Sequence, residues 1–184
     1  MDLKTLRNRI AEKARAVQTI VSEMESVDEA LAYAVDLTQA QKQKTVAAPG
    51  LNVAAREKLQ ALCSASGVTL LDEPLLPGKP AIQTSLTIAA WGIADTGTIA
   101  IPSDSEDIRV ATMLCETHVA VLPESTIAPD SLAIQDRLDQ ILKQDAPSYT
   151  AFITGASRTA DIERVLAIGV HGPQELHLLI VKGA

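Results

Sequence analysis

The sequence predicts an α/β fold in which a mainly parallel sheet is flanked by helices, with an N-terminal helical extension. From residue 44 onward, strand-like and helical segments alternate, which is typical of βαβ units. Hydrophobic residues make up 47% of the chain but aromatic residues only 2%, so Ala, Val, Ile and Leu must form the core, as in buried parallel sheets. A chain of 184 residues can bury such a core as one domain. We expect the extension to span residues 1–43 and the α/β domain residues 44–184.

Apolar residues in the N-terminal part recur at steps of three and four, which predicts helices. The stretch "LKTLRNRIAEKARAVQTIVSEM" predicts a first helix through residue 24. A second helix is expected over residues 26–43, because Ser26 followed by Glu29 forms a capping box. The apolar stripes of both helices must pack on the main domain or on a partner subunit.

Short apolar runs, separated by turn residues, predict the strands of the main domain. They cover residues 44–48, 68–73, 85–94, 97–102, 117–123, 148–155 and 175–181. Helices are expected between them, with Asn52, Ser105 and Asp130 as N-caps and Gly67 as a stop signal. The predicted helices cover residues 52–67, 105–116, 130–144 and 158–167.

Charge and composition argue against several classes of protein. The net charge is −7 and the basic residues form no stripe, which argues against nucleic-acid binding. We expect no membrane span and no secretory signal, and hence a cytoplasmic protein, because no apolar run is long enough and the N-terminus is charged. The only two cysteines, Cys63 and Cys115, are too few to hold an iron–sulfur cluster or a structural zinc. We therefore expect no cofactor of either kind.

The turn "GIADTGTIAIP", residues 92–102, contains the Asp-Thr-Gly signature of aspartic proteases. That chemistry needs two aspartates sharing a proton, and this chain has one such motif in a half-helical sequence. A hairpin explains the turn better, with Gly97 supplying a positive φ. The turn residues also lie where open α/β sheets place ligands; they are Asp95, Thr96, Gly97 and Thr98.

A second polar segment, "ITGASRTADIERVLAIGVHGPQELHLLIV", spans residues 153–181. Ser157 or Thr159 could cap its short helix, whose backbone N–H groups would then bind an anion, and Arg158 could pair with a carboxylate. His171 lies on a glycine-flanked loop and is the best titratable candidate. Arg109, on the predicted helix after the turn, could reach back to Asp95. The remaining candidates in this segment are Asp161, Glu163 and Gly172.

Other conspicuous residues favour structural roles. His118 and His177 lie in apolar strands, where core or edge positions are expected, and Trp91 is expected to pack in the core. The acidic and histidine candidates lack the short spacing of a metal site, so we expect no metal.

Together, "GIADTGTIAI", "HVAVLP" and the segment 153–181 resemble the lactate utilization protein C family, the LUD domain. The resemblance covers residues 82–181 in the family's order. It implies the α/β fold of the sugar isomerases and CoA transferases. In the related CoA transferases a carboxylate before a glycine-containing turn is the nucleophile; Asp95 lies in a similar place, although many family members have Glu there.

The resemblance implies a non-redox component of an L-lactate oxidation system, which acts with iron–sulfur partner proteins and binds a small carboxylate. The alternative is a stand-alone isomerase- or transferase-like enzyme that uses Asp95 or Glu163 on a sugar phosphate or acyl-CoA. A scaffold acting through the N-terminal helices is a third possibility. On the first interpretation, the two polar segments are expected to line one cleft at the carboxyl edge of the sheet.

Overall fold

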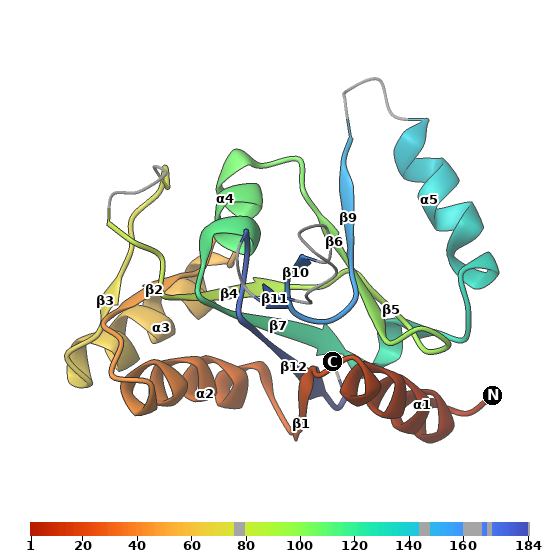
Figure 1. Ribbon diagram of the computed structural model, residues 1–184, viewed down its shortest axis with the longest axis horizontal. Helices are drawn as coiled ribbons and strands as arrows, with labels where there is room; N and C mark the ends of the chain where they lie inside the picture. The colour runs from red at the N-terminus through yellow and green to blue at the C-terminus, as the bar shows by residue number, and fades with distance from the viewer. Residues whose placement is uncertain (76–79, 144–147, 160–166, 169–170, 184) are drawn as a thin grey trace.

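The protein is built around a six-stranded sheet in which every neighbouring pair is parallel (Figure 1). The computed structural model describes residues 1–75, 80–143, 148–159, 167–168 and 171–183. This sheet confirms the predicted fold class. Its strands, in spatial order, are β1 (Ile20–Met24), β12 (Glu175–Val181), β7 (Thr117–Pro123), β4 (Thr84–Ile88), β2 (Thr45–Ala47) and β3 (Thr69–Leu70).

The two faces of this sheet are covered by different elements (Figure 1). Helices α2 (Val27–Ala40) and α3 (Val53–Ala65) pack on one face, against side chains such as Leu86, Val119 and Leu179. Helix α1 (Leu3–Ala16) packs on the other face, against Leu122, Leu178 and Ile180. Because successive side chains of a strand alternate between the faces, the continuous apolar runs of β7 and β12 fill both cores.

A second sheet of four strands lies on the same side as α1, and helices α4 and α5 complete the fold. The order of the second sheet is β8 (Ile127–Ala128), β5 (Trp91–Ile93), β6 (Thr98–Pro102) and β9 (Thr150–Ile153). The helices are α4 (Glu106–Leu114) and α5 (Gln135–Leu142), with single 3-10 turns η1 (Glu124–Thr126) and η2 (Leu132–Ile134). A small antiparallel pair joins β10 (Arg158–Thr159) to β11 (Ala167–Ile168).

Three of the four predicted N-caps are confirmed. The side chains of Ser26, Asn52 and Ser105 accept hydrogen bonds from the first turns of α2, α3 and α4. The prediction that Asp130 caps a helix is wrong: Asp130 accepts a hydrogen bond from the backbone N–H of Ala133 in a 3-10 turn, and α5 begins only at Gln135, without a side-chain cap. Gly67 ends α3 with a φ of 65°. Local capping chemistry thus sets the helix starts before any long-range contact is considered.

The prediction of a helix through residue 24 is wrong. Helix α1 ends at Ala16, and Ile20–Met24 form β1, which pairs in parallel with β12 from Ile20 opposite His177. Without this segment, one edge of β12 would have unpaired backbone N–H and C=O groups. The segment itself contains the β-branched residues Ile20 and Val21, which favour strands. Tertiary pairing therefore overrides the helical spacing.

The predicted helix over residues 158–167 is also wrong at both of its ends. Arg158–Thr159 and Ala167–Ile168 pair as antiparallel strands, so neither Ser157 nor Thr159 caps a helix that begins there. Residues 160–166 lie outside the described residues.

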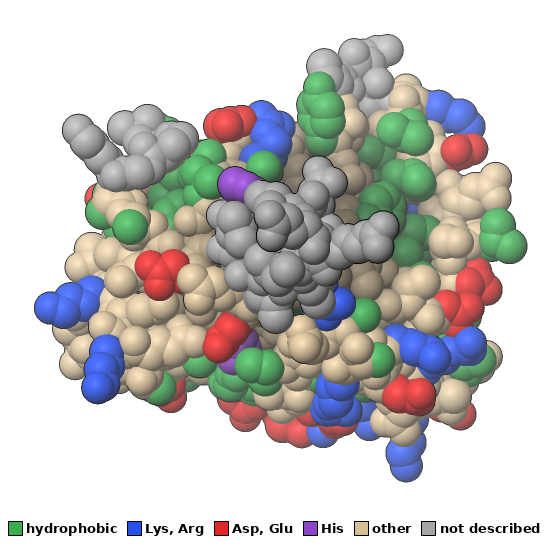
Figure 2. Space-filling view, in the orientation of Figure 1, with side chains coloured by type: hydrophobic (Ala, Val, Ile, Leu, Met, Phe, Trp, Pro, Cys, Tyr) green, Lys and Arg blue, Asp and Glu red, His purple; other side chains and the backbone are tan. Residues whose placement is uncertain are grey.

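The hairpin interpretation of the Asp-Thr-Gly-Thr turn is confirmed, because β5 and β6 pair antiparallel around it and Gly97 has a φ of 67°. Trp91 is buried in the core of the second sheet, as expected. Among the described residues, the helices are too short or too polar for a membrane crossing. Figure 2 shows acidic and basic side chains interspersed over one face of the molecule.

Replacing Gly97 by Ala should destabilise the fold far more than the same change at Gly67. Both glycines have nearly the same positive φ, 67° and 65°. A Cβ at Gly97 would lie 2.4 Å from the backbone nitrogen of Ala14 in α1, whereas a Cβ at Gly67 would meet nothing within 4 Å. We expect Gly67→Ala to cost about 1 kcal/mol, and Gly97→Ala at least about 2 kcal/mol more, because backbone atoms of α1 must move.

Urea unfolding of the parent and the two variants measures these free energies. Equal losses of unfolding free energy in the two variants would show that the backbone of α1 does not limit the space at Gly97.

Candidate functional site

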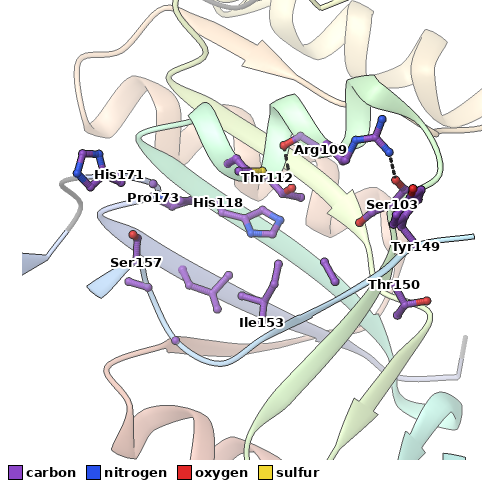
Figure 3. Close-up of a pocket in the computed structure, with 16 residues that line it drawn as sticks. Ser103, Arg109, Thr112, His118, Tyr149, Thr150, Ile153, Ser157, His171 and Pro173 are labelled. Atoms are coloured by element: carbon purple, nitrogen blue, oxygen red, sulfur yellow. Dashed lines mark hydrogen bonds between the residues drawn. The ribbon is translucent and has the colours of Figure 1, made fainter. Parts of the chain in front are cut away.

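A cavity of about 350 Å³ lies between the large sheet, helix α4 and strand β9 (Figure 3). Its walls come from four parts of the chain: the end of β6 with α4, the start of β7, the segment from β9 to Ser157, and the loop before β12. The lining residues are Ser103, Arg109, Thr112, Met113, His118, Tyr149, Thr150, Ala151, Ile153, Gly155, Ala156, Ser157, His171, Gly172, Pro173 and Leu176.

The cavity lies at the amino ends of the parallel strands, and the expected position at their carboxyl edge is therefore wrong. His118 and Leu176 are the second residues of β7 and β12. At the carboxyl end, Glu124 directly follows β7 and pairs with Arg7 of α1 at 2.6 Å. Helix α1 and this largely buried ion pair fill the carboxyl end of the sheet, and the open space lies at the amino end.

His118 forms the inner wall of the cavity (Figure 3). Its side chain is 1% exposed, and its Nε2 lies 2.8 Å from the hydroxyl oxygen of Thr87 on β4. Burial lowers the pKa of His118 to about 4, because the charged imidazolium loses hydration there. The ring is therefore uncharged at neutral pH.

The rim of the cavity is polar and more exposed. The Arg109 guanidinium is held by two bonds to Glu106, by one from its Nη1 to the carbonyl of Ser103 at 2.7 Å, and by stacking on the Tyr149 ring at 5.6 Å. A guanidinium has more N–H groups than these bonds use, so Arg109 can still donate outward. His171 is exposed. In Figure 3 it lies near Ser157, at the end of the cavity opposite to Arg109.

Four of the residues that the sequence singled out line this cavity: Arg109, Ser157, His171 and Gly172. Gly172 lies close to Ser157, since a Cβ on it would come within 2.9 Å of the Ser157 side chain. These residues come from two distant parts of the chain, α4 and the segment around the 153–181 motif, and the tertiary fold brings them together.

The Asp-Thr-Gly-Thr turn lies elsewhere, against the C-terminal half of α1. Asp95 pairs with Arg9 at 2.5 Å, not with Arg109. The hydroxyl of Thr98 is 2.7 Å from those of both Thr96 and Thr154. The turn therefore does meet the 153–181 segment, but through threonine hydroxyls rather than at the cavity.

Arg158 also points away from the cavity, since its guanidinium donates to the backbone carbonyl of Val17 at the end of α1. The side chain of Thr159, and the whole of Asp161 and Glu163, lie outside the described residues.

The sequence pattern did not reveal that His118 lines a cavity, nor that Ser103, Thr112 and Tyr149 do. The core or edge position of His118 was expected, but the cavity beside it depends on α4 and β9 lining the same space as the start of β7. One signal was available: a histidine near the start of an otherwise apolar strand.

The chain matches the LUD domain family model over residues 7–181. The chain belongs to the LUD domain family. This match extends the resemblance seen in the sequence to almost the whole chain, including α1 and β1.

Several curated relatives of this LUD domain are named Lactate utilization protein C. The one from Bacillus subtilis (strain 168) is 33% identical over 102 residues, 54% of this chain and 42% of that protein. The one from Macrococcus caseolyticus (strain JCSC5402) is 31% identical over 101 residues, 54% of this chain and 44% of that protein. The alignments therefore span less than half of the relatives' length.

A solved structure shares the fold of this LUD domain from end to end. It is the crystal structure of a DUF162 family protein from Deinococcus radiodurans, with a TM-score of 0.64 and 15% identity, over 98% of this chain and 99% of that one.

The LUD domain should lose stability on acidification because of His118. The unfolded chain binds a proton on this residue below about pH 6.5, whereas the folded protein does so only below about pH 4. The free energy of unfolding therefore falls as the pH falls through this window, by up to about 3 kcal/mol from this one group.

Urea unfolding at pH 7 and pH 4.5 measures the loss. His118→Gln, which cannot titrate, should lose clearly less stability than the parent over the same interval. Parallel losses in the two proteins would contradict the prediction.

Proposed function

We propose that this LUD domain is a non-redox component of a lactate utilization system, in which it binds a small carboxylate. Its family membership and the name of its relatives support the process. The observation that carries the binding role is the cavity, whose rim presents a positioned arginine at one end and Ser157 and His171 at the other. A fixed guanidinium is well suited to a carboxylate, because its remaining N–H groups already point in a set direction.

The electrons of lactate oxidation would pass through iron–sulfur partner proteins. The chain has two cysteines, Cys63 and Cys115, and both are buried. Burial raises the pKa of the Cys63 thiol to about 11 and that of Cys115 to about 12, so neither is a ready thiolate ligand. Redox centres are therefore proposed to belong to partners, with this chain supplying a ligand site or a docking surface.

The stand-alone enzyme would depend on Asp95 or Glu163. Asp95 is paired with Arg9 and does not line the cavity, and Glu163 lies outside the described residues. We therefore favour the lactate role.

Titration calorimetry with L-lactate and with pyruvate tests the proposal. We expect the parent to bind at least one of them, and Arg109→Gln to bind it about tenfold more weakly, since a charged hydrogen bond is lost. Arg56→Gln is a matched control, because Arg56 also combines a bond to a glutamate, Glu73 at 3.1 Å, with one to a backbone carbonyl, but outside the cavity.

Two results would count against the proposal: no binding of either acid by the parent, or equal binding by the parent and Arg109→Gln. Asp95→Asn distinguishes the alternative, because it should bind as the parent does if the cavity is the site. A loss confined to Asp95→Asn would favour the enzyme interpretation.

A further inference from the structure

The inner end of the cavity contains a polar atom that the protein leaves unused. Nδ1 of His118 has no hydrogen-bond partner among the described residues, although the side chain is almost completely buried. The ring lines the cavity, so a molecule bound there can approach Nδ1. A ligand atom that hydrogen-bonds to Nδ1 would give this nitrogen the partner that the described part of the protein does not supply.

The contact with Thr87 decides which ring nitrogen carries the proton. The hydroxyl of Thr87 is 1% exposed and has no partner in the described part of the chain other than Nε2 of His118. If Nε2 donated to it, the hydroxyl hydrogen of Thr87 would be buried without an acceptor. Thr87 therefore donates to Nε2, and the uncharged ring carries its proton on Nδ1. The cavity thus presents a single N–H donor at its inner end.

The surroundings of this donor are uncharged. Leu176, Ile153 and Pro173 form the apolar walls, and the hydroxyl of Thr112 donates to backbone carbonyls of its own helix. The one cationic side chain of the described lining, Arg109, is at the rim and already paired with Glu106. An ionised ligand group at the inner end would have no counter-charge, and burying it there would be costly.

We propose that the inner end of the cavity binds an apolar molecule through an uncharged carbonyl oxygen, which accepts a hydrogen bond from Nδ1 of His118. The whole cavity, rim included, measures about 350 Å³, which leaves room for such a molecule at its inner end. The inference goes beyond the proposed function, because it concerns the inner end rather than the rim and holds whatever the process.

The test compares 1-indanone with indane, a pair of ring compounds that differ in the carbonyl. Long-range ¹H–¹⁵N spectra of the ¹⁵N-labelled parent at pH 7 should show His118 protonated on Nδ1, and its ring signals should shift with 1-indanone. Binding followed in the same samples should be about tenfold tighter for 1-indanone than for indane, the value of one neutral hydrogen bond of about 1.4 kcal/mol.

Variants assign the preference to His118. His118→Phe keeps a ring but has no N–H, so it should bind the two compounds about equally. Thr87→Val removes the hydroxyl that fixes the tautomer and should reduce the preference, whereas Thr38→Val, a change of another fully buried threonine outside the cavity, should not. The spectra of the parent test the tautomer and the contact even if His118→Phe does not fold.

Protonation of His118 on Nε2, equal affinity of the parent for the two compounds, or no binding of 1-indanone would each overturn the inference. Its failure is separate from that of the proposed function, which is read from lactate or pyruvate binding and from Arg109→Gln at the rim.

Discussion

The close approach of helix α1 to the β5–β6 hairpin is the contact on which the arrangement of this protein depends. Gly97 allows the turn to touch the backbone of α1, and Gly92 allows β5 to lie against Ile10, since a Cβ there would come within 2.6 Å of Ile10 Cδ1. Protein interiors are packed so densely that a side chain at position 92 or 97 would clash with α1. In this position α1 covers the carboxyl end of the sheet, and the cavity lies at the amino end.

Burial divides the cavity into two chemical environments. At the rim, Arg109 forms an ion pair with Glu106 in a partly exposed position. At the inner end, His118 is surrounded by apolar groups that stabilise only its uncharged form. One opening can thus present a charged group to solvent and a neutral donor to whatever lies deeper, and the two environments can be tested with different ligands.

Local sequence predicted much of the fold and part of the site. The caps at Ser26, Asn52 and Ser105, the turn at Gly97 and the apolar strands depend on neighbouring residues, so they were correctly predicted. The segment Ile20–Met24 was not, because its strand exists only through its pairing with β12, at the far end of the chain. The ion pair of Asp95 with Arg9 joins segments far apart in sequence and could not be predicted from spacing for the same reason.

The sequence by itself determined the fold class, the family, the helix that carries Arg109 and the polar segment that contains Ser157 and His171, since these follow from periodicity, composition and motif. Only the tertiary structure decided that the space lies at the amino ends of β7 and β12, that Asp95 is turned toward α1, and that His118 faces a cavity. Those facts depend on which elements pack over which end of the sheet, and packing joins residues whose separation along the chain carries no local signal.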